Sequence, residues 1–306
     1  HDVILPPSAS GGAQDGQVVS ARIVQQPETR VQPVGEVVEV LGERMDPGME
    51  IDIAIRSYEI PAEFPPEVHD QIAEMSAEVA EQDKLHRIDL RDVPLVTIDG
   101  EDAKDFDDAV CAWKTRSGSF KLIVAIADVS HYVRPGSALD EEAIRRGNSV
   151  YFPGQVVPML PELLSNGLCS LNPHADRLAM VCEMNISKSG AISRYRFYEA
   201  VFRSHARLTY DKVAAILDTE SSEGEALRED YRELVPSLEH LHALYKVLRQ
   251  ARVERGAIDF ETTETAIIFN EERKIEKIVP RPRNDAHKII EECMLAANVA
   301  TARFLD

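Results

Sequence analysis

The ten residues from Asp99 to Asp108, called the acidic run here, restrict the fold of this chain more than any other segment. They carry six carboxylates and a single lysine. Unpaired like charges ~4 Å apart repel by ~1 to 4 kcal/mol per pair, depending on the effective dielectric. Apolar residues nevertheless frame the run, with Ile98 before it and Val110 shortly after it. A solvated surface loop is the common fate of a charge run, but such a loop does not need apolar flanks.

Asp99, Asp105, Asp107 and Asp108 are the candidate metal ligands within the run. In a strand Asp105 and Asp107 share a face, whereas in a helix Asp105 and Asp108 do, so all four converge only on an irregular turn. A calcium EF-hand is excluded because no register places Gly at the sixth loop position and Glu at the twelfth. Hard oxygen ligands suit magnesium, and two magnesium ions ~4 Å apart suit in-line phosphodiester hydrolysis. The residues therefore favour a magnesium site over a solvated loop.

Composition and length narrow the class of protein. The 306 residues allow one large domain and a smaller one, and the hydrophobic share of 44% argues against disorder. The chain has no apolar run of about 18 residues and no signal peptide, and its start without Met predicts a piece of something longer. A net charge of −19 argues against a protein that coats itself with nucleic acid, but a nuclease remains open.

The cysteines point to a reducing compartment. Four are present, they lie far apart, and none forms a CxxC pair. A disulfide framework or a zinc site is therefore disfavoured, and reduced thiols in a cytoplasmic protein are expected. The four are Cys111, Cys169, Cys182 and Cys293.

The N-terminal region reads as short strands. Residues 18–24 and 34–41 are rich in β-formers, and Met49, Ile51, Ile53 and Ile55 alternate with more polar residues, which predicts a half-buried strand. Such strands suit a small barrel of the OB or cold-shock type, here incomplete. Residues 65–82 then predict one amphipathic helix.

The remainder, 89–306, reads as one mixed α/β domain. The continuous apolar run 122–127 predicts a strand buried on both faces. Residues 235–255 and 286–305 predict long helices, the first stopped by Gly256.

The chain resembles the RNB exoribonucleases, the ribonuclease II and ribonuclease R family. The sequence of residues 92–110 carries the resemblance, and the segment Gly-Glu-Asp-Ala within it is closest to the bacterial ribonuclease R type. Further motifs follow in order over nearly the whole chain, which makes the series very specific. They lie at 124–130 (VAIADVS), 149–153 (SVYFP), 158–161 (PMLP), 168–173 (LCSLNP), 205–210 (HARLTY) and 283–287 (RNDAH).

This resemblance implies a fold and an activity. The fold is α+β, with a partial OB-type cold-shock barrel at 1–64, a linker helix at 65–88, and the N-terminal part of a mixed α/β RNB catalytic domain at 89–306. The activity is processive 3′-to-5′ hydrolysis of single-stranded RNA, which releases nucleoside 5′-monophosphates and requires Mg²⁺.

The resemblance also implies roles for single residues. The four aspartates Asp99, Asp105, Asp107 and Asp108 match the catalytic, magnesium-holding set, with Asp107 foremost. Tyr151 matches an aromatic residue that stacks on a base, although an ordinary core tyrosine is the alternative. Phe260 corresponds to the opposing aromatic clamp. Glu291, or its neighbour Glu292, corresponds to a glutamate that contacts the terminal nucleotide, although a helix-surface glutamate is the default.

Family members continue past the segment that matches this chain, so we expect the 306 residues to be inactive alone. A second polypeptide carrying the remainder is one way to complete the site. The rival hypothesis is a catalytically silent RNB-like protein that binds RNA or acts as a scaffold. A DNA-directed nuclease is a third option, which 2′-hydroxyl contacts would disfavour.

Overall fold

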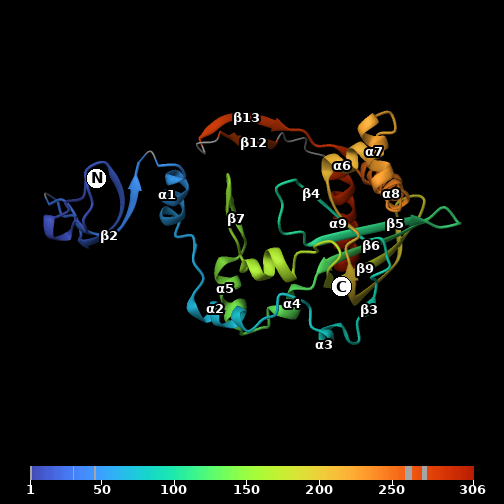
Figure 1. The fold of residues 1–306 in the computed structure, drawn as a ribbon, viewed down its shortest axis with the longest axis horizontal. Coiled ribbons are helices and arrows are strands. Elements are labelled where there is room, and N and C mark those ends of the chain that lie inside the picture. The colour runs from blue at the N-terminus through green and yellow to red at the C-terminus, as the bar shows by residue number, and fades with distance from the viewer. Residues whose placement is uncertain (1, 30, 45, 259–263, 271–273) are drawn as a thin grey trace. The chain divides into compact units, whose positions relative to one another are not determined.

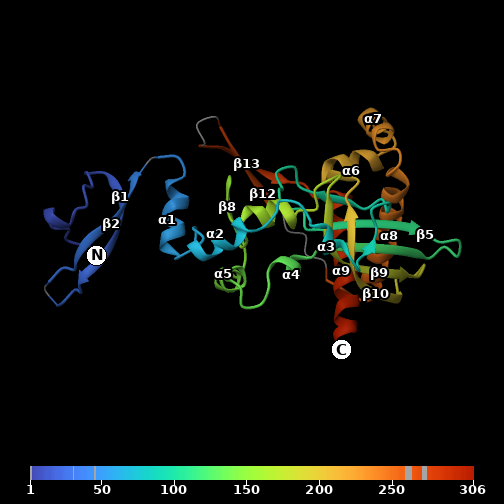
Figure 2. The same cartoon turned by 60° about the horizontal axis from the view of Figure 1, so that its bottom comes forward.

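The computed structural model describes residues 2–29, 31–44, 46–258, 264–270 and 274–306 (Figures 1 and 2). The chain divides into two compact units, each assembled from several segments. Unit 1 comprises His1–Phe64, Asn148–Val157 and Glu264–Arg281, and unit 2 comprises Pro65–Gly147, Pro158–Thr263 and Pro282–Asp306. Within the described residues, no helix is long and apolar enough to cross a membrane.

Unit 1 consists mainly of antiparallel hairpins. The pairing of β1 with β2 confirms the two strands predicted near the N-terminus, and its register shifts at three points mark bulges that bend the pair. Further hairpins join β7 to β8 and β12 to β13. The described elements are η1 Pro7–Ala9, β1 Gln17–Gln25, β2 Val34–Glu43, α1 Met49–Ser57, β7 Val150–Phe152, β8 Gln155–Val157, β12 Glu264–Phe269 and β13 Ile275–Arg281.

The strand predicted over the alternating residues 49–56 is wrong, because this segment forms helix α1. Gly48 precedes the helix with a φ of +91°, a conformation that glycine adopts at little cost. Acidic residues in the first turn and Arg56 in the last turn match the helix dipole. Arg56 also donates to Glu39 on β2, so these charges favour a helix where the apolar alternation alone suggested a strand.

Unit 2 is built on a seven-stranded mixed sheet in the order β11-β4-β5-β6-β9-β10-β3, counted over the described residues. The pairs from β4 to β10 are antiparallel, whereas the two edge strands, β11 and β3, run parallel to their neighbours. The strands are β3 Ile88–Asp89, β4 Val96–Asp99, β5 Asp108–Lys114, β6 Phe120–Ala127, β9 Asp176–Ile186, β10 Ile192–Arg203 and β11 Ala206–Thr209.

Helices cover one face of this sheet and form the core with it. Figures 1 and 2 both show α8 and α9 lying against β5, β6 and β9. Leu122 and Val124 of β6 belong to the same buried hydrophobic cluster as Leu241 of α8 and Cys293 of α9. Ile123, on the opposite side of β6, is also buried, which confirms a strand covered on both faces. Both long helices are confirmed close to their predicted bounds, as α8 Val235–Glu254 and α9 Asp285–Leu305.

The single helix predicted over residues 65–82 is wrong in its extent. The structure has α2 Pro66–Ala73 and then, after a break, the short α3 Glu81–Lys84. Val68 is buried as the amphipathic pattern required, but the helix ends at Ala73. The remaining helical elements of unit 2 are α4 Val129–Tyr132, α5 Ala138–Arg146, the π-helix η2 Leu163–Leu168, α6 Tyr210–Leu217 and α7 Ser222–Asp230.

A buried ion pair ties the start of unit 2 to the end of β6. Arg87, just before β3, donates to Asp128 at 2.6 Å, and each side chain is only 5% exposed. Burial alone would raise the pKa of Asp128, but hydrogen bonds from Arg87 and Ser130 outweigh it and hold that pKa below its usual range. Removing either partner would therefore leave the other as a buried charge without its counter-ion, which is destabilising.

Removing the arginine should destabilise unit 2 strongly. We expect Arg87→Ala to cost about 3 to 5 kcal/mol of unfolding free energy at neutral pH, since Asp128 stays buried without the cation that pairs with it. The folded-state pKa of Asp128 is lowered, so the pair contributes fully at neutral pH, and the deficit should shrink as pH falls below about 4. Urea denaturation measures it. The control Arg232→Ala breaks an exposed pair with Glu229 and should change stability by no more than about 0.5 kcal/mol; equal losses in both variants would contradict the prediction.

Candidate active site

The acidic run connects two adjacent central strands of the sheet in unit 2. β4 ends at Asp99 and β5 begins at Asp108, and Val96 pairs with Val110 in antiparallel register. The end of one strand and the start of the other therefore meet at the same edge of the sheet. Residues 100–107 between them form neither helix nor strand, which confirms the irregular turn expected from their spacing.

Charge accumulates at this edge. Burial raises the pKa of Asp108 to about 7, and the neighbouring charges of Asp107 and Asp99 contribute to the rise. Partial desolvation also raises the pKa of Asp107, with further contributions from the charges of Asp105 and Asp99. All four predicted aspartates therefore interact electrostatically within one small region, where nearby negative charges make Asp107 and Asp108 harder to ionise.

One carboxylate oxygen in this cluster lacks a hydrogen bond. Oδ2 of Asp108 is buried and has no partner among the described residues, while Oδ1 of Asp99 accepts from the backbone N–H of Gly100 at 2.7 Å. A buried, unpartnered carboxylate oxygen is costly unless a cation or donor meets it. Together with an all-oxygen donor set, this orphan oxygen fits a hard divalent cation.

The aspartates do not already form a closed metal cage. Among the described residues, no three His, Cys, Asp or Glu side chains are arranged so that they could hold an ion. The assignment of the four aspartates as metal ligands and catalytic residues thus stays a prediction. Glu101 and Asp102, which share the run, are exposed to solvent.

The backbone of the run is held from outside by residues that the sequence reasoning did not single out. Phe106 is buried at its centre, where its N–H donates to Oγ of Ser170 and its carbonyl accepts from the N–H of Leu171. Arg207 on β11 lies over the Phe106 ring, 4.2 Å from Cζ to the ring centroid. Ser170 and Arg207 belong to the LCSLNP and HARLTY motifs, and their membership of these motifs was the available signal.

The predicted RNA-binding residues are placed as follows. Tyr151 lies on β7 in unit 1 and is 65% exposed, so the alternative of an ordinary core tyrosine is wrong. Its stacking role stays a prediction. Phe260 lies outside the described residues.

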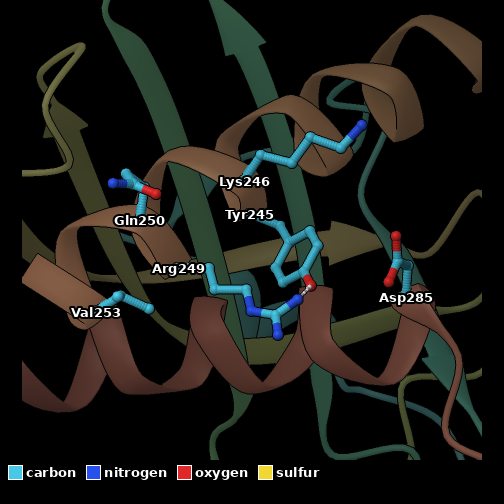
Figure 3. Close-up of a pocket in the computed structure, with 6 residues that line it drawn as sticks. All are labelled: Tyr245, Lys246, Arg249, Gln250, Val253 and Asp285. Atoms are coloured by element: carbon cyan, nitrogen blue, oxygen red, sulfur yellow. Dashed lines mark hydrogen bonds between the residues drawn. The ribbon is translucent and has the colours of Figure 1, made fainter. Parts of the chain in front are cut away.

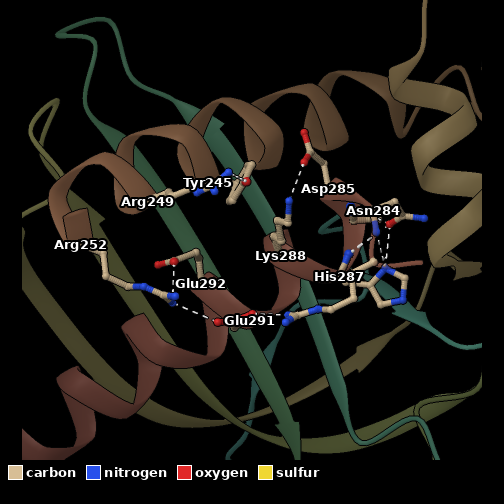
Figure 4. A network of polar contacts seen from close by, with 11 residues as sticks. Tyr245, Arg249, Arg252, Asn284, Asp285, His287, Lys288, Glu291 and Glu292 are labelled. Carbon is tan, nitrogen blue, oxygen red and sulfur yellow. Dashed lines mark hydrogen bonds and ion pairs between the residues drawn. The ribbon is translucent and has the colours of Figure 1, made fainter. Parts of the chain in front are cut away.

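Glu291 and Glu292 on α9 both bind the same arginine (Figure 4). Nη1 of Arg252 on α8 lies 3.0 Å from a carboxylate oxygen of each, and Arg283 donates to Glu291 at 2.5 Å. Burial would raise the pKa of Glu291, but the bonds from Arg252 and Arg283 outweigh it and lower that pKa. Glu291 is thus an ionised group inside an α8–α9 network, and a contact with RNA stays a prediction.

The same network begins at the N-terminus of α9, in the RNDAH motif. The side chain of Asn284 accepts from the backbone N–H groups of Ala286 and His287, which caps the helix. The His287 ring stacks on Tyr210 at 3.8 Å between centroids. This motif therefore has a structural role, which is to fix the start of α9.

A separate hollow of about 430 Å³ lies between α8 and the first residue of α9 (Figure 3). Arg249 donates to the hydroxyl of Tyr245, one turn earlier on α8, at 3.0 Å. None of the predicted site residues lines it; the lining residues are Tyr245, Lys246, Arg249, Gln250, Val253 and Asp285.

Comparison with known families agrees with this architecture. Residues 87–306 match the RNB domain, and residues 1–65 match the cold shock domain. The chain belongs to the RNB family, which confirms the resemblance and the predicted α+β fold class.

Two relatives lie within the ribonuclease R branch. The chain is 61% identical over 306 residues to Ribonuclease R of Vibrio parahaemolyticus serotype O3:K6 and 57% identical over 305 residues to Ribonuclease R of Escherichia coli strain K12. Both alignments cover 100% of this chain but 36% and 37% of the relatives. The chain thus spans little more than a third of their length. In both relatives the matching segment is part of one longer chain, which gives no support to a second polypeptide.

Solved structures show the same fold. RNase R of Mycoplasma genitalium in complex with double-stranded RNA superposes with a TM-score of 0.89 at 33% identity, over 99% of this chain and 53% of that one. The same enzyme with ribose-methylated single-stranded RNA gives 0.88 at 32% identity, over 99% and 46%. A yeast pseudonuclease at 17% identity and a TM-score of 0.67, covering 95% of this chain and 36% of that one, shares the fold alone.

The raised pKa of Asp108 predicts how the metal-free chain responds to substitution. At pH 8 we expect Asp108→Asn to stabilise the chain by about 1 to 3 kcal/mol in a chelator, because a buried charge is removed. Added Mg²⁺ should raise the thermal midpoint of the unsubstituted chain more than that of the variant. Differential scanning calorimetry with and without Mg²⁺ measures both.

The matched control is Asp102→Asn, which removes an exposed carboxylate of the same run and should change neither stability nor the response to Mg²⁺. If Asp108→Asn lowers the metal-free midpoint, the charge at Asp108 is already compensated within the protein and the prediction is wrong.

Proposed function

We propose that this chain carries the catalytic centre of a magnesium-dependent exoribonuclease that hydrolyses RNA from its 3′ end and releases nucleoside 5′-monophosphates. One observation carries the proposal, namely the carboxylate cluster at the joined ends of β4 and β5. Burial and the neighbouring carboxylates raise the pKa values of Asp107 and Asp108, and Asp108 holds a buried oxygen without a partner among the described residues. A divalent cation offsets both costs, and the relatives named Ribonuclease R supply the class of reaction.

The proposed roles follow from the chemistry of the side chains. Asp99, Asp105, Asp107 and Asp108 hold Mg²⁺, which supplies Lewis-acid stabilisation for phosphodiester hydrolysis when bound. Asp107 is partly desolvated but keeps some of its surface in contact with solvent. It is therefore the carboxylate best placed to orient an attacking water from the solvent side.

The RNA contacts are proposed on chemical grounds as well. Tyr151 is a large exposed aromatic residue, and base stacking on such a ring is worth ~1 to 3 kcal/mol per base without regard to sequence. Phe260 is the second aromatic partner, and Glu291 or Glu292 contacts the last nucleotide. The substrate is a single-stranded RNA 3′ end, in keeping with the RNase R structure solved with ribose-methylated single-stranded RNA, and the proposed compartment is the cytoplasm.

A catalytically silent RNA-binding protein is the rival function. A protein that only binds RNA gains nothing from four mutually repelling carboxylates, so their presence favours catalysis. Substitution of the aspartates separates the two possibilities, because a silent binder would retain its full function without them.

Exchange of this segment into a full-length relative tests the proposed function. We expect residues 1–306, placed in V. parahaemolyticus Ribonuclease R in exchange for the matching segment, to shorten 5′-labelled single-stranded RNA from its 3′ end with Mg²⁺. Asp107→Asn should lower the rate at least about 100-fold, since one charge-stabilising ligand is lost. Denaturing gels and chromatography of the released mononucleotides measure the rate.

Asp102→Asn in the same exchanged enzyme is the control and should retain activity within about twofold, because that side chain is exposed and lies outside the proposed ligand set. Undiminished decay by the Asp107→Asn variant would refute the catalytic assignment. The 306 residues assayed alone test the expectation that they bind metal without rapid turnover, and a DNA oligomer of the same sequence tests the preference for RNA.

A further inference from the structure

The backbone of the acidic run is fixed by groups that lie outside it. The carbonyl of Ala103 accepts from Arg207 at 2.5 Å, and the carbonyl of Lys104 accepts from Oγ of Ser170 at 2.9 Å. The carbonyl of Phe106 accepts from the N–H of Leu171 at 2.7 Å, and that of Asp107 from the N–H of Ala127 at 2.8 Å. Neighbouring elements thus hold the main chain from residue 103 to residue 107, while the acidic side chains provide none of these bonds.

Ser170 holds one side of the run. It is fully buried, its hydroxyl donates to the Lys104 carbonyl, and its oxygen accepts from the Phe106 N–H at 3.2 Å. Its own carbonyl accepts from Nε of the buried Arg177 at 2.8 Å, which fixes Ser170 in turn. One side chain therefore satisfies two backbone groups next to Asp105.

Arg207 holds the other side. Its guanidinium lies over the ring of the buried Phe106 and bonds the Ala103 carbonyl, so it contacts the run at two points. Thr209, two residues further along β11, pairs with Asp99 on β4. Arg207 therefore links the strand next to Asp99 to the segment that carries Asp105 and Asp107.

We propose that Arg207 and Ser170 are positioning residues that clamp Phe106 and thereby set the separation of the metal-binding aspartates. The inference rests on the proposed function, since it assigns these two residues a task at that site. Neither residue supplies a ligand. They act through the backbone, in the way that outer groups around a metal site orient its ligands.

The test uses the 306-residue chain with Mn²⁺ as a paramagnetic probe in place of Mg²⁺. Free Mn²⁺ is counted by electron paramagnetic resonance, and amide exchange is followed at residues 103–107 and at Leu171. We expect Arg207→Ala and Ser170→Ala each to weaken Mn²⁺ binding about tenfold or more and to speed exchange in this segment. Arg207→Lys keeps a donor for the Ala103 carbonyl and should restore part of the affinity.

The matched control is Arg196→Ala on β10. Like Arg207, Arg196 lies over an aromatic ring, that of Tyr198 at 4.9 Å, but its polar partner is the carboxylate of Glu183 at 2.7 Å and not the backbone of the acidic run. It should leave Mn²⁺ affinity and exchange at 103–107 unchanged.

The outcomes separate the two proposals. Mn²⁺ affinity within about twofold of the unsubstituted chain for Arg207→Ala, or an equal loss for Arg196→Ala, would overturn the positioning role. If the unsubstituted chain binds no Mn²⁺, the proposed function fails. The clamp is then judged by exchange alone, and unchanged protection at 103–107 in both variants would overturn it as well.

Discussion

Negative charge gathered at the joined ends of β4 and β5 is the constraint on which the rest of unit 2 depends. Burial and the charges of Asp107 and Asp99 raise the pKa of Asp108, so the folded chain bears a cost at the point where its chemistry is proposed to occur. The charge of Asp108 also acts on a buried residue of helix α9. Burial raises the pKa of the Cys293 thiol on α9, with a smaller contribution from the charge of Asp108.

Rigid, apolar packing in the rest of unit 2 offsets this loss of stability. β5 and β6 lie in the middle of the sheet, and α8 and α9 cover the face that includes Leu122 and Val124. The polar links of unit 2, such as Arg87 with Asp128 and Arg252 with the two glutamates of α9, fasten elements that lie far apart in the chain. A stable frame of this kind allows a strained cluster to persist, because the frame contributes the stability that the cluster lacks.

The sequence predicted those elements in which one pattern excluded the others. The apolar run 122–127 became part of β6, buried except at Ile126, and the helix predicted over 235–255 became α8, because length and periodicity left little choice. The strand predicted for residues 49–56 was wrong, because the alternation of Met49 to Ile55 fits a strand while the charges of Glu50, Asp52 and Arg56 fit a helix. The apolar residues of 65–82 keep a helical spacing throughout, although the helix is interrupted between Ala73 and Glu81. No proline or glycine in that interval marks the interruption.

By itself the sequence determined which side chains gather at the site, since Asp99 and Asp108 are nine positions apart and flank a short connection between apolar segments. Local spacing also required an irregular turn. Only the tertiary structure decided what holds that turn, because Ser170 and Arg207 are more than 60 residues from the atoms they contact. Contacts over such distances depend on the order of strands in the sheet. The parallel addition of β11 beside β4, which brings Arg207 to the acidic run, is a property of the folded chain that local pattern does not contain.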